Sequence, residues 1–402
     1  MKQRFVNPFT PNRPIDDPDR FFGREEAVNE LIDTLFQIMN KNPKHTIITG
    51  ERGVGKSSLL TQIYLTSKGD KRLTDRLGVE TGVDKYNFLS VWHDVDVNQG
   101  IEELASGILG RFDSEIKKLF SGVKVEFDLK GFIKISKEKI SKTSISDYVN
   151  EFVSRLKTIE NKAIEQGKGG VAIFIDELDR AKINSGISTF FKLAIERLSR
   201  ENIKKVAFIC AGITGAVQKL EEEHASILRT FRDVPLNAFN EEEVGQILLS
   251  GFQIAKLSVN DMDSIKRKAW EVTIGLPEPV HLIGSEMLSV DEDGILDIKD
   301  FEASINKIIT DVRKNKLGSI LKKAGGGKYQ KILEAMAQHE KKIVPLEFIA
   351  GIIKQDQSQF STNMGTLIDR EILYKPATGF YAFCDPMLKE YIRKFGILSL
   401  ED

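Results

Sequence analysis

The sequence predicts an α/β protein, in which a parallel sheet covered by helices is followed by an α-helical lid domain and a C-terminal winged helix. Apolar segments typical of buried strands alternate with amphipathic helices up to about residue 238. Helical patterns dominate from Asn240 to about residue 320. After the glycine-rich segment AGGGKY, three short helical segments precede two strands around a turn. We therefore expect four parts: an N-terminal arm (1–20), an α/β core (21–238), a helical domain (239–320) and a winged helix (321–402).

The composition is that of a globular protein, with 41% hydrophobic and 29% charged residues and a net charge of −1. No apolar run reaches membrane-spanning length, and the first residues lack the apolar core of a signal peptide. Cys210 and Cys384 are far apart and lack the spacing of metal ligands. We expect a cytoplasmic protein without a membrane partner.

The proline-rich arm precedes the core, and the core begins with a helix that starts near the segment FFGREE. Apolar residues recur behind this segment at helical spacing, namely Val28, Leu31, Ile32, Leu35 and Phe36. The apolar segment Thr46–Thr49 then predicts a buried strand, and Ser57–Ser67 predicts a helix.

Between this strand and helix lies GERGVGKSS, which fits the spacing G-x-x-x-x-G-K-[ST]. Glycines allow backbone N–H groups to converge on an anion, and the start of the helix adds a positive dipole end. Lys56 is placed to reach the β- and γ-phosphates of a nucleotide, and Ser57 to ligate Mg²⁺. A turn that matches by accident is the alternative, but the flanking strand and helix favour a phosphate cradle. Its predicted members are Gly50, Gly53, Val54, Gly55, Lys56, Ser57 and Ser58.

Further along the core, Asn87–Val97 predicts a second strand and residues 101–112 a helix. Residues 123–137 alternate in polarity and predict a β-hairpin insertion, and residues 144–166 predict a long amphipathic helix. Together these segments predict strands of a sheet connected by helices.

A second catalytic motif is predicted in VAIFIDELD, where an apolar strand ends in acidic residues. Asp176 would emerge at the carboxyl end of the strand and hold Mg²⁺ together with Ser57. Glu177 is the candidate that orients or deprotonates the attacking water. A solvated acidic turn is the alternative, but the upstream phosphate cradle favours nucleotide hydrolysis.

Three further residues are candidates for the same chemistry. Thr214 follows the strand Lys204–Gly212, where it would touch the γ-phosphate or the water, or serve only as a turn residue. Arg229 and Arg232 precede a short strand, and either could complete a neighbouring protomer's site as an arginine finger. Arg229 is the first choice, and ordinary surface arginines are the alternative.

In the C-terminal domain, the helix around Gln359–Arg370 would enter the major groove if the domain binds DNA. This helix has few basic residues, and winged helices also dock proteins, so both interpretations are open. Residues 303–402 carry 16 Lys and Arg against 11 Asp and Glu, most densely over 311–331. That basic stretch indicates either a nucleic-acid surface or a solvated helix and linker.

Together these motifs resemble the AAA+ ATPases, and specifically the branch with a C-terminal winged helix that contains the origin-recognition ATPases and the related STAND-type archaeal ATPases. FFGREE is similar to that branch's box before the phosphate cradle, which implies adenine contacts from Phe22, Gly23 and Arg24. TIGLPEPVHLIG is similar to the lid signature G-x-P, with Gly275 and Pro277 in place. The resemblance implies ATP and Mg²⁺ as cofactors and the P-loop NTPase form of the sheet.

The sequence departs from the origin-recognition pattern at the lid. The segment Gly275–Glu278 carries no sensor arginine, and His281 either faces the nucleotide or packs inside the lid. The STAND-like version fits this segment better.

We expect an ATP-hydrolysing switch that couples its nucleotide state to self-assembly, or to engagement of a partner protein or DNA. One alternative is an initiator-like ATP-dependent DNA-binding protein. Another is a nucleotide sensor that does not hydrolyse ATP and acts in a defence or signalling complex.

Overall fold

The computed structural model describes residues 6–119, 144–182, 185–214 and 230–396. They fall into two compact units. The sheet unit comprises residues 14–237, and the helical unit comprises residues 238–396 together with residues 6–13. The chain therefore passes between the two units twice, at 13/14 and at 237/238.

The sheet unit contains a five-stranded parallel sheet in the order β2-β3-β4-β1-β5. The three inner strands are buried along their whole length, because helices cover both faces of the sheet. The edge strand β5 instead contains both buried and exposed residues. The strands are β1 (His45–Gly50), β2 (Leu89–Asp94), β3 (Val171–Asp176), β4 (Val206–Gly212) and β5 (Phe231–Leu236).

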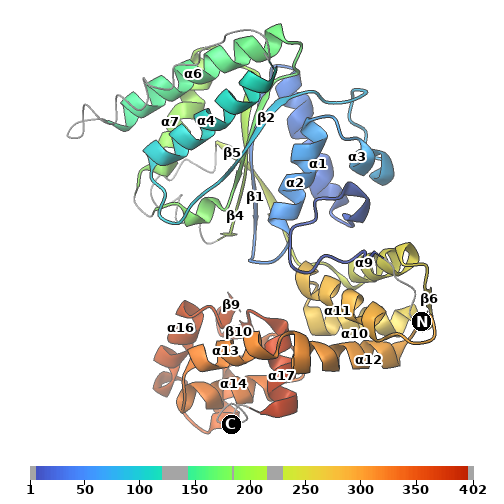
Figure 1. Ribbon diagram of the computed structural model, residues 1–402. Coiled ribbons are helices and arrows are strands. Elements are labelled where there is room, and N and C mark those ends of the chain that lie inside the picture. The colour runs from blue at the N-terminus through green and yellow to red at the C-terminus, as the bar shows by residue number, and fades with distance from the viewer. Residues whose placement is uncertain (1–5, 120–143, 183–184, 215–229, 397–402) are drawn as a thin grey trace. The chain divides into compact units, whose positions relative to one another are not determined.

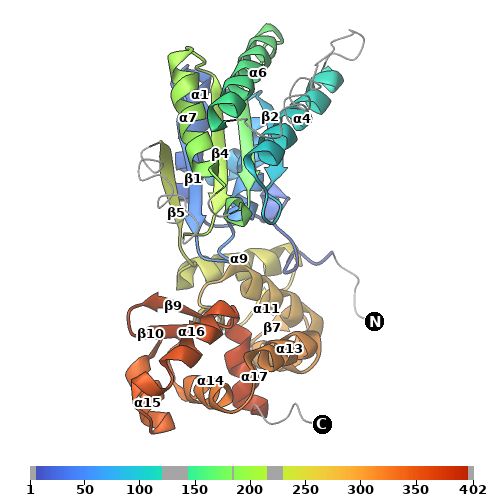
Figure 2. The same cartoon turned by 90° about the vertical axis from the view of Figure 1, so that its left-hand side faces the viewer.

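One helical layer consists of α1, α2 and α3, and the other of α4, α6 and α7 (Figure 1). The second layer and the sheet share an aromatic core that includes Phe152, Phe190, Phe191 and Phe208. In Figure 2, β1 and β5 run side by side, in agreement with their pairing over six residues. The helices are α1 (Glu25–Met39), α2 (Lys56–Ser67), α3 (Arg72–Leu77), α4 (Ile101–Leu119), α6 (Ile145–Glu165) and α7 (Ile187–Arg200), with the 3-10 turns η1 (Pro18–Arg20) and η2 (Leu178–Arg180).

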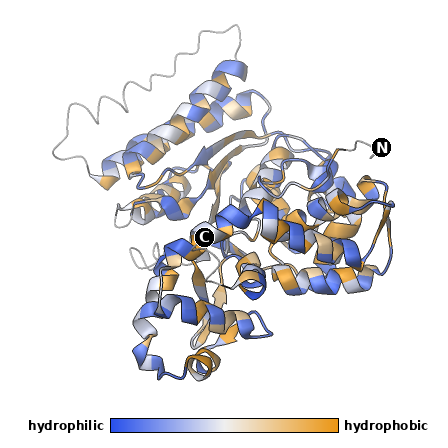
Figure 3. Cartoon of the chain, turned by 60° about the horizontal axis from the view of Figure 1, so that its bottom comes forward, coloured by the Kyte–Doolittle hydropathy of each residue, from blue (hydrophilic) through white to orange (hydrophobic). Residues whose placement is uncertain are grey.

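The helical unit begins with four helices and a short parallel strand pair between β6 and β7. These elements are α9 (Glu241–Ile254), β6 (Ser258–Val259), α10 (Met262–Thr273), α11 (Pro277–Val290), β7 (Ile295–Leu296) and α12 (Ile298–Lys307). A π-helical turn, η4 (Ile308–Val312), then leads into α13 (Lys314–Ala324). Figure 3 shows hydrophobic and hydrophilic residues alternating along these helices, as amphipathic helices on a shared core require.

The rest of the helical unit has the predicted order of three helices followed by a hairpin and a last helix. A three-stranded antiparallel sheet, β8-β10-β9, closes it. The elements are α14 (Lys328–Gln338), β8 (Val344–Pro345), α15 (Leu346–Ile353), η5 (Gln357–Gln359), α16 (Ser361–Asp369), β9 (Leu373–Ala377), β10 (Phe380–Phe383) and α17 (Pro386–Phe395). No helix in the described ranges is long and apolar enough to cross a membrane.

Candidate nucleotide site

The predicted phosphate cradle is the loop between β1 and α2. Gly50 ends β1 so close to β5 that a Cβ there would lie 2.4 Å from the carbonyl oxygen of Leu236. Gly55 stands at the N-cap of α2 with φ of 98°, and no side chain caps the helix. The first N–H groups of α2 therefore have no side-chain acceptor of their own, which is the arrangement that binds anions.

Lys56 lies at the mouth of this loop. Its Nζ donates to the carbonyl oxygens of Gly50 and Glu51, each at 2.9 Å. Burial lowers the pKa of Lys56, and the nearby carboxylates of Asp179 and Asp176 oppose that change. The ammonium is therefore held at the cradle by weak carbonyl acceptors that a phosphate can replace.

Asp176 ends β3 and is only 6% exposed. Its Oδ1 accepts a hydrogen bond of 2.8 Å from the amide of Glu177. Burial raises the pKa of the Asp176 carboxyl, and hydrogen bonds from the Ser57 hydroxyl and the Glu177 amide oppose the rise. The structure thus brings together Ser57 of α2 and Asp176 of β3, the two predicted Mg²⁺ ligands. A hydroxyl beside a carboxylate is a donor set that suits Mg²⁺.

Glu177 follows directly, in the left-handed region with φ of 56°. This conformation turns its side chain away from the line of β3, and the carboxylate pairs with Arg180 at 2.7 Å. Burial raises the pKa of Glu177, the Arg180 guanidinium lowers it, and the charges of Asp176, Asp179 and Asp94 raise it. A non-glycine residue in this conformation is uncommon and clusters at functional sites.

Two further acidic residues lie beside this pair. Asp94 ends β2 as the register partner of Asp176, and its charge raises the pKa of both Asp176 and Glu177. Asp179 accepts a hydrogen bond of 3.1 Å from the amide of Ile213, which fixes the end of β4 to the η2 turn. The sequence feature that could have identified Asp94 as a site residue is its place at the end of a predicted apolar strand, as for Asp176.

The predicted adenine box forms the turn before α1. Gly23 and Arg24 both have a φ of 68°. The Arg24 guanidinium donates to the carbonyl oxygen of Val54 at 2.8 Å and to that of Asn237 at 2.6 Å. Arg24 thus ties the box to the phosphate loop and to the end of the sheet unit.

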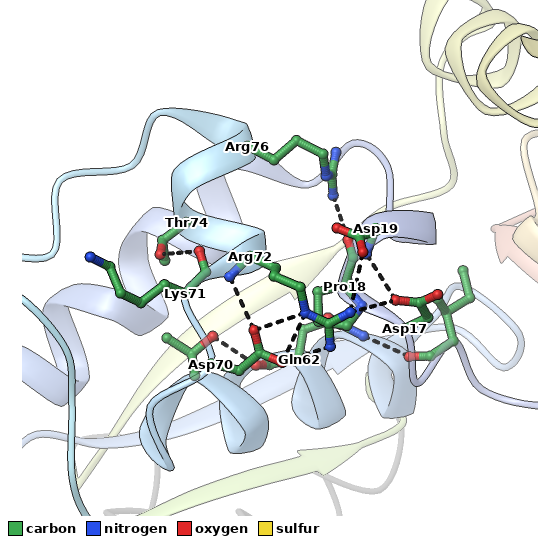
Figure 4. A network of polar contacts seen from close by, with 11 residues as sticks. Asp17, Pro18, Asp19, Gln62, Asp70, Lys71, Arg72, Thr74 and Arg76 are labelled. Atoms are coloured by element: carbon green, nitrogen blue, oxygen red, sulfur yellow. Dashed lines mark hydrogen bonds and ion pairs between the residues drawn. The ribbon is translucent and has the colours of Figure 1, made fainter. Parts of the chain in front are cut away.

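Arg76 of α3 completes the box, and no sequence motif predicted this residue. Its guanidinium lies 5.1 Å from the ring centroid of Phe22 and donates to the carbonyl oxygens of Pro18 and Phe21. Figure 4 shows Arg76 and Arg72 reaching from α3 to the segment around η1. Arg72 pairs there with Asp17 at 3.1 Å and with Asp19 at 3.2 Å. The location of the Phe22 ring is therefore determined by α3 as well as by the turn in which Phe22 lies.

Ser58 also contacts the N-terminal segment. Its Oγ accepts a hydrogen bond of 3.1 Å from the amide of Ile15, and Gln62 donates to the Ile15 carbonyl at 2.7 Å. The predicted cradle residue Ser58 thus holds the N-terminal segment against α2.

The remaining candidates of the sheet unit are placed as follows. Thr214 lies two residues beyond the end of β4 and is exposed. Arg229 and the 123–137 insertion lie outside the described residues. Arg232 pairs with Glu30 at 3.5 Å and with Asp33 at 3.2 Å, so its guanidinium is engaged by α1 of the same chain.

The G-x-P segment lies in the helical unit and is described there alone. Gly275 has a φ of 70°, and a Cβ on it would lie 1.9 Å from the Phe239 carbonyl oxygen. Pro277 is the first residue of α11, where its fixed φ suits helix initiation. These two residues set a tight turn between α10 and α11.

His281 packs inside the helical unit, which is the second of its two predicted roles. It is 4% exposed, its Nδ1 accepts a hydrogen bond of 3.3 Å from the Thr10 amide, and its ring lies edge-on to Phe9. Burial lowers the pKa of His281 to about 4. Phe9 itself is 4% exposed between α9 and α11, where Gly251 and Gly284 leave room for its ring.

An ion-pair group joins α11 to α17. Arg313, between η4 and α13, is buried and pairs with Glu278 of α11 and with Asp385, the N-cap of α17, at 3.1 Å. Asp385 also pairs with Lys316 at 3.2 Å. Sequence spacing gave no signal for these pairs.

Comparison with known proteins agrees with the motifs. Residues 20–194 match the family model described as AAA ATPase domain, and residues 326–392 match a domain of unknown function (DUF8462). No curated protein matches the sequence. A similar solved structure is the Aeropyrum pernix ORC2 protein in ADPNP and ADP complexes. It has 12% identity and a TM-score of 0.55, with 98% of this chain and 97% of that chain covered.

Cdc6p from Pyrobaculum aerophilum is also similar, with 13% identity and a TM-score of 0.45 over 98% of this chain and 97% of that one. The ORC2 likeness shows the fold, so the predicted AAA+ architecture of a P-loop sheet followed by a helical region is confirmed.

Proposed function

We propose that the chain binds and hydrolyses ATP with Mg²⁺, because residues 20–194 match the AAA ATPase domain model and the fold is similar to that of an origin-recognition protein. The observation that carries the proposal is the grouping at the carboxyl end of the sheet. There Lys56 lies at the glycine loop, the Ser57 hydroxyl is close enough to Asp176 to lower the pKa of its carboxyl, and Glu177 stands next to Asp176. Each residue type is needed at this spacing for phosphoryl transfer to water.

In the proposed mechanism, the α2 N-terminus and Lys56 bind the β- and γ-phosphates. Ser57 and Asp176 would hold Mg²⁺, which neutralises charge on the phosphates when bound. The Glu177 carboxylate accepts a hydrogen bond from the attacking water, for which it must release Arg180. Phe22 and Arg24 place the base against the turn that Arg76 supports.

The test uses calorimetric titration with Mg-ATP and steady-state phosphate release on the full chain. We expect Lys56→Ala to weaken ATP binding at least 10-fold, because the phosphates lose their cation. Glu177→Gln should keep the affinity within about twofold and lower turnover about 100-fold or more. Lys44→Ala, which removes a lysine at the other end of β1, is the matched control.

An equal loss in the Lys44→Ala control, or normal affinity in Lys56→Ala, would contradict the assigned cradle. Binding without turnover in the parent chain would support the non-hydrolysing sensor instead.

We further propose that protomers assemble with Arg229 acting in trans, because Arg232 is engaged by Glu30 and Asp33 within its own chain. Arg229→Ala should then bind ATP normally and lose turnover only at concentrations where the parent assembles. Concentration-independent turnover in both proteins would count against this role.

We assign residues 239–320 to a lid and residues 321–402 to a winged helix that delivers the output to a partner protein or DNA. Support for the winged helix comes from the order α14, β8, α15, α16, β9, β10, α17 and from the sheet order β8-β10-β9. The Thr214 hydroxyl remains our candidate for sensing the γ-phosphate at the end of β4.

A further inference from the structure

The basic charge of the helical unit is concentrated on and beside α13. Between Asp311 and Glu334 the sequence has seven basic residues and no acidic one. They are Arg313, Lys314, Lys316, Lys322, Lys323, Lys328 and Lys331. This stretch covers α13, the glycine turn and the first residues of α14.

The helix α13 is amphipathic, with one buried side and one exposed polar side. Its buried positions are Leu317, Gly318, Leu321 and Ala324. At 100° per residue, the opposite side carries Asn315, Lys316, Ser319, Lys322 and Lys323, all exposed. We call these five residues the α13 face. Its members are three cations and two uncharged hydrogen-bonding side chains.

Part of this charge is neutralised within the unit and part is not. Arg313 and Lys316 pair with carboxylates of α11 and α17. In the described part of the chain, no carboxylate forms an ion pair with Lys314, Lys322, Lys323 or Lys331. Lys322 and Lys323 lie in the last turn of α13, where the helix dipole favours cations. That effect does not account for Lys314 at the start of the helix or for Lys331 on α14.

In contrast to α13, the helix predicted to enter the major groove, α16, has no basic residues from Ser361 to Asp369. The next residue, Arg370, donates to the Ala324 carbonyl oxygen at 2.7 Å and lies over the Tyr329 ring. The densest group of cations in this part of the chain is therefore on and beside α13 and not on α16.

We propose that the α13 face, with Lys314 and Lys331, binds the phosphate backbone of duplex DNA without reading its sequence. Lysine, asparagine and serine side chains are typical phosphate contacts. Single-stranded binding needs exposed aromatic rings for base stacking, and α13 has none. A protein interface needs an apolar or aromatic centre and is depleted in lysine, whereas the α13 face has three lysines and no apolar residue.

The test measures duplex binding by fluorescence anisotropy on the full chain without nucleotide, over 50–200 mM NaCl. The variant is Lys314→Gln/Lys322→Gln/Lys323→Gln. Each lost phosphate contact lowers the slope of log affinity against log salt by about 0.9, so three contacts lower it by about 2.7. The parent should then lose about 40-fold more affinity than the variant across this fourfold range of salt.

The matched control is Lys117→Gln/Lys118→Gln/Lys157→Gln, which removes three exposed lysines of the sheet unit with the same change in net charge. It should keep the parent slope. A control slope that falls equally would assign the effect to net charge and overturn the proposal.

The proposal is also overturned if the parent does not bind duplex at 50 mM salt, or if the variant keeps the parent slope. Stronger competition by single-stranded DNA or by poly-glutamate than by duplex would assign the surface to those partners. ATP turnover of the variant should equal the parent's, because these lysines are outside the proposed nucleotide site. Failure of the DNA proposal therefore remains distinguishable from failure of the ATPase proposal.

Discussion

Removal of Arg313 tests whether its ion pairs stabilise the helical unit. In Arg313→Met the unbranched stem of the side chain is kept, and the charged guanidinium group is lost. Removing one partner of a buried ion pair costs about 3–5 kcal/mol when the other charge stays buried and unpaired. Here Glu278 is 38% exposed and can be hydrated, and Asp385 keeps Lys316 and its cap bond to the Met387 amide. We therefore expect the free energy of unfolding to fall by about 2–3 kcal/mol.

The assay is urea unfolding of the full chain followed by tryptophan fluorescence. The two tryptophans are Trp92 in β2 and Trp270 in α10, one in each unit. In a Trp92→Phe background the signal reports the helical unit alone. Lys268→Met is the control, because Lys268 lies in α10 of the same unit and its ion pair with Glu302 is solvent-exposed, so the change should lower the free energy of unfolding by less than about 1 kcal/mol.

Adding Glu278→Gln completes a double-mutant cycle. If the losses in the two single variants add up to the loss in the double variant, Arg313 and Glu278 do not interact. An unfolding free energy of Arg313→Met within about 0.5 kcal/mol of the parent would refute the reasoning.

Three further predictions can be measured by the same urea assay, the first two of them in the Trp92→Phe background. Gly275→Ala should lower the free energy of unfolding by about 3 kcal/mol, because the new Cβ would lie 1.9 Å from a backbone oxygen. Gly294→Ala is the control: Gly294 has a similar φ but open space around it, so the loss should be about 1 kcal/mol. Equal losses in the two variants would contradict the steric argument. Phe9→Ala should lower the free energy of unfolding by about 3–5 kcal/mol and Phe9→Leu by much less, because the ring fills the space between α9 and α11. A loss below about 1 kcal/mol in Phe9→Ala would count against this packing. In the Trp270→Phe background, which reports the sheet unit, stability should fall as pH drops from 6.5 toward 3, because burial lowers the pKa of His45 to about 3 and the unfolded state alone binds the proton in that window. His45→Asn keeps an acceptor for the Phe208 amide and should flatten this dependence by up to about 1.4 kcal/mol per pH unit; an unchanged slope would exclude His45 as its source.

The sheet and the nucleotide motifs were predictable because their signals are local. β3 and β4 are buried along their whole length, so their sequences are continuous apolar runs. The phosphate loop has a fixed spacing of glycines and lysine within nine residues. In both cases the physical requirement acts on neighbouring positions of the chain.

The features that the sequence did not reveal depend on contacts between distant positions. α3 has six residues, too few for helical periodicity, so Arg76 could not be connected with Phe22. β6, β7 and β8 have two residues each and leave no alternating pattern. Arg313 pairs with residues 35 positions before it and 72 after it, and lone charges give no indication of such partners.

The placement of Phe9 has a consequence for biosynthesis. The helices that receive its ring are synthesised only after the entire sheet unit has been synthesised. Until then this aromatic side chain has no native site, while residues 14–20 can already settle on the nascent α/β layers. Docking of the Phe9 ring therefore closes a loop between the N-terminal segment and helices that are synthesised after the whole sheet unit.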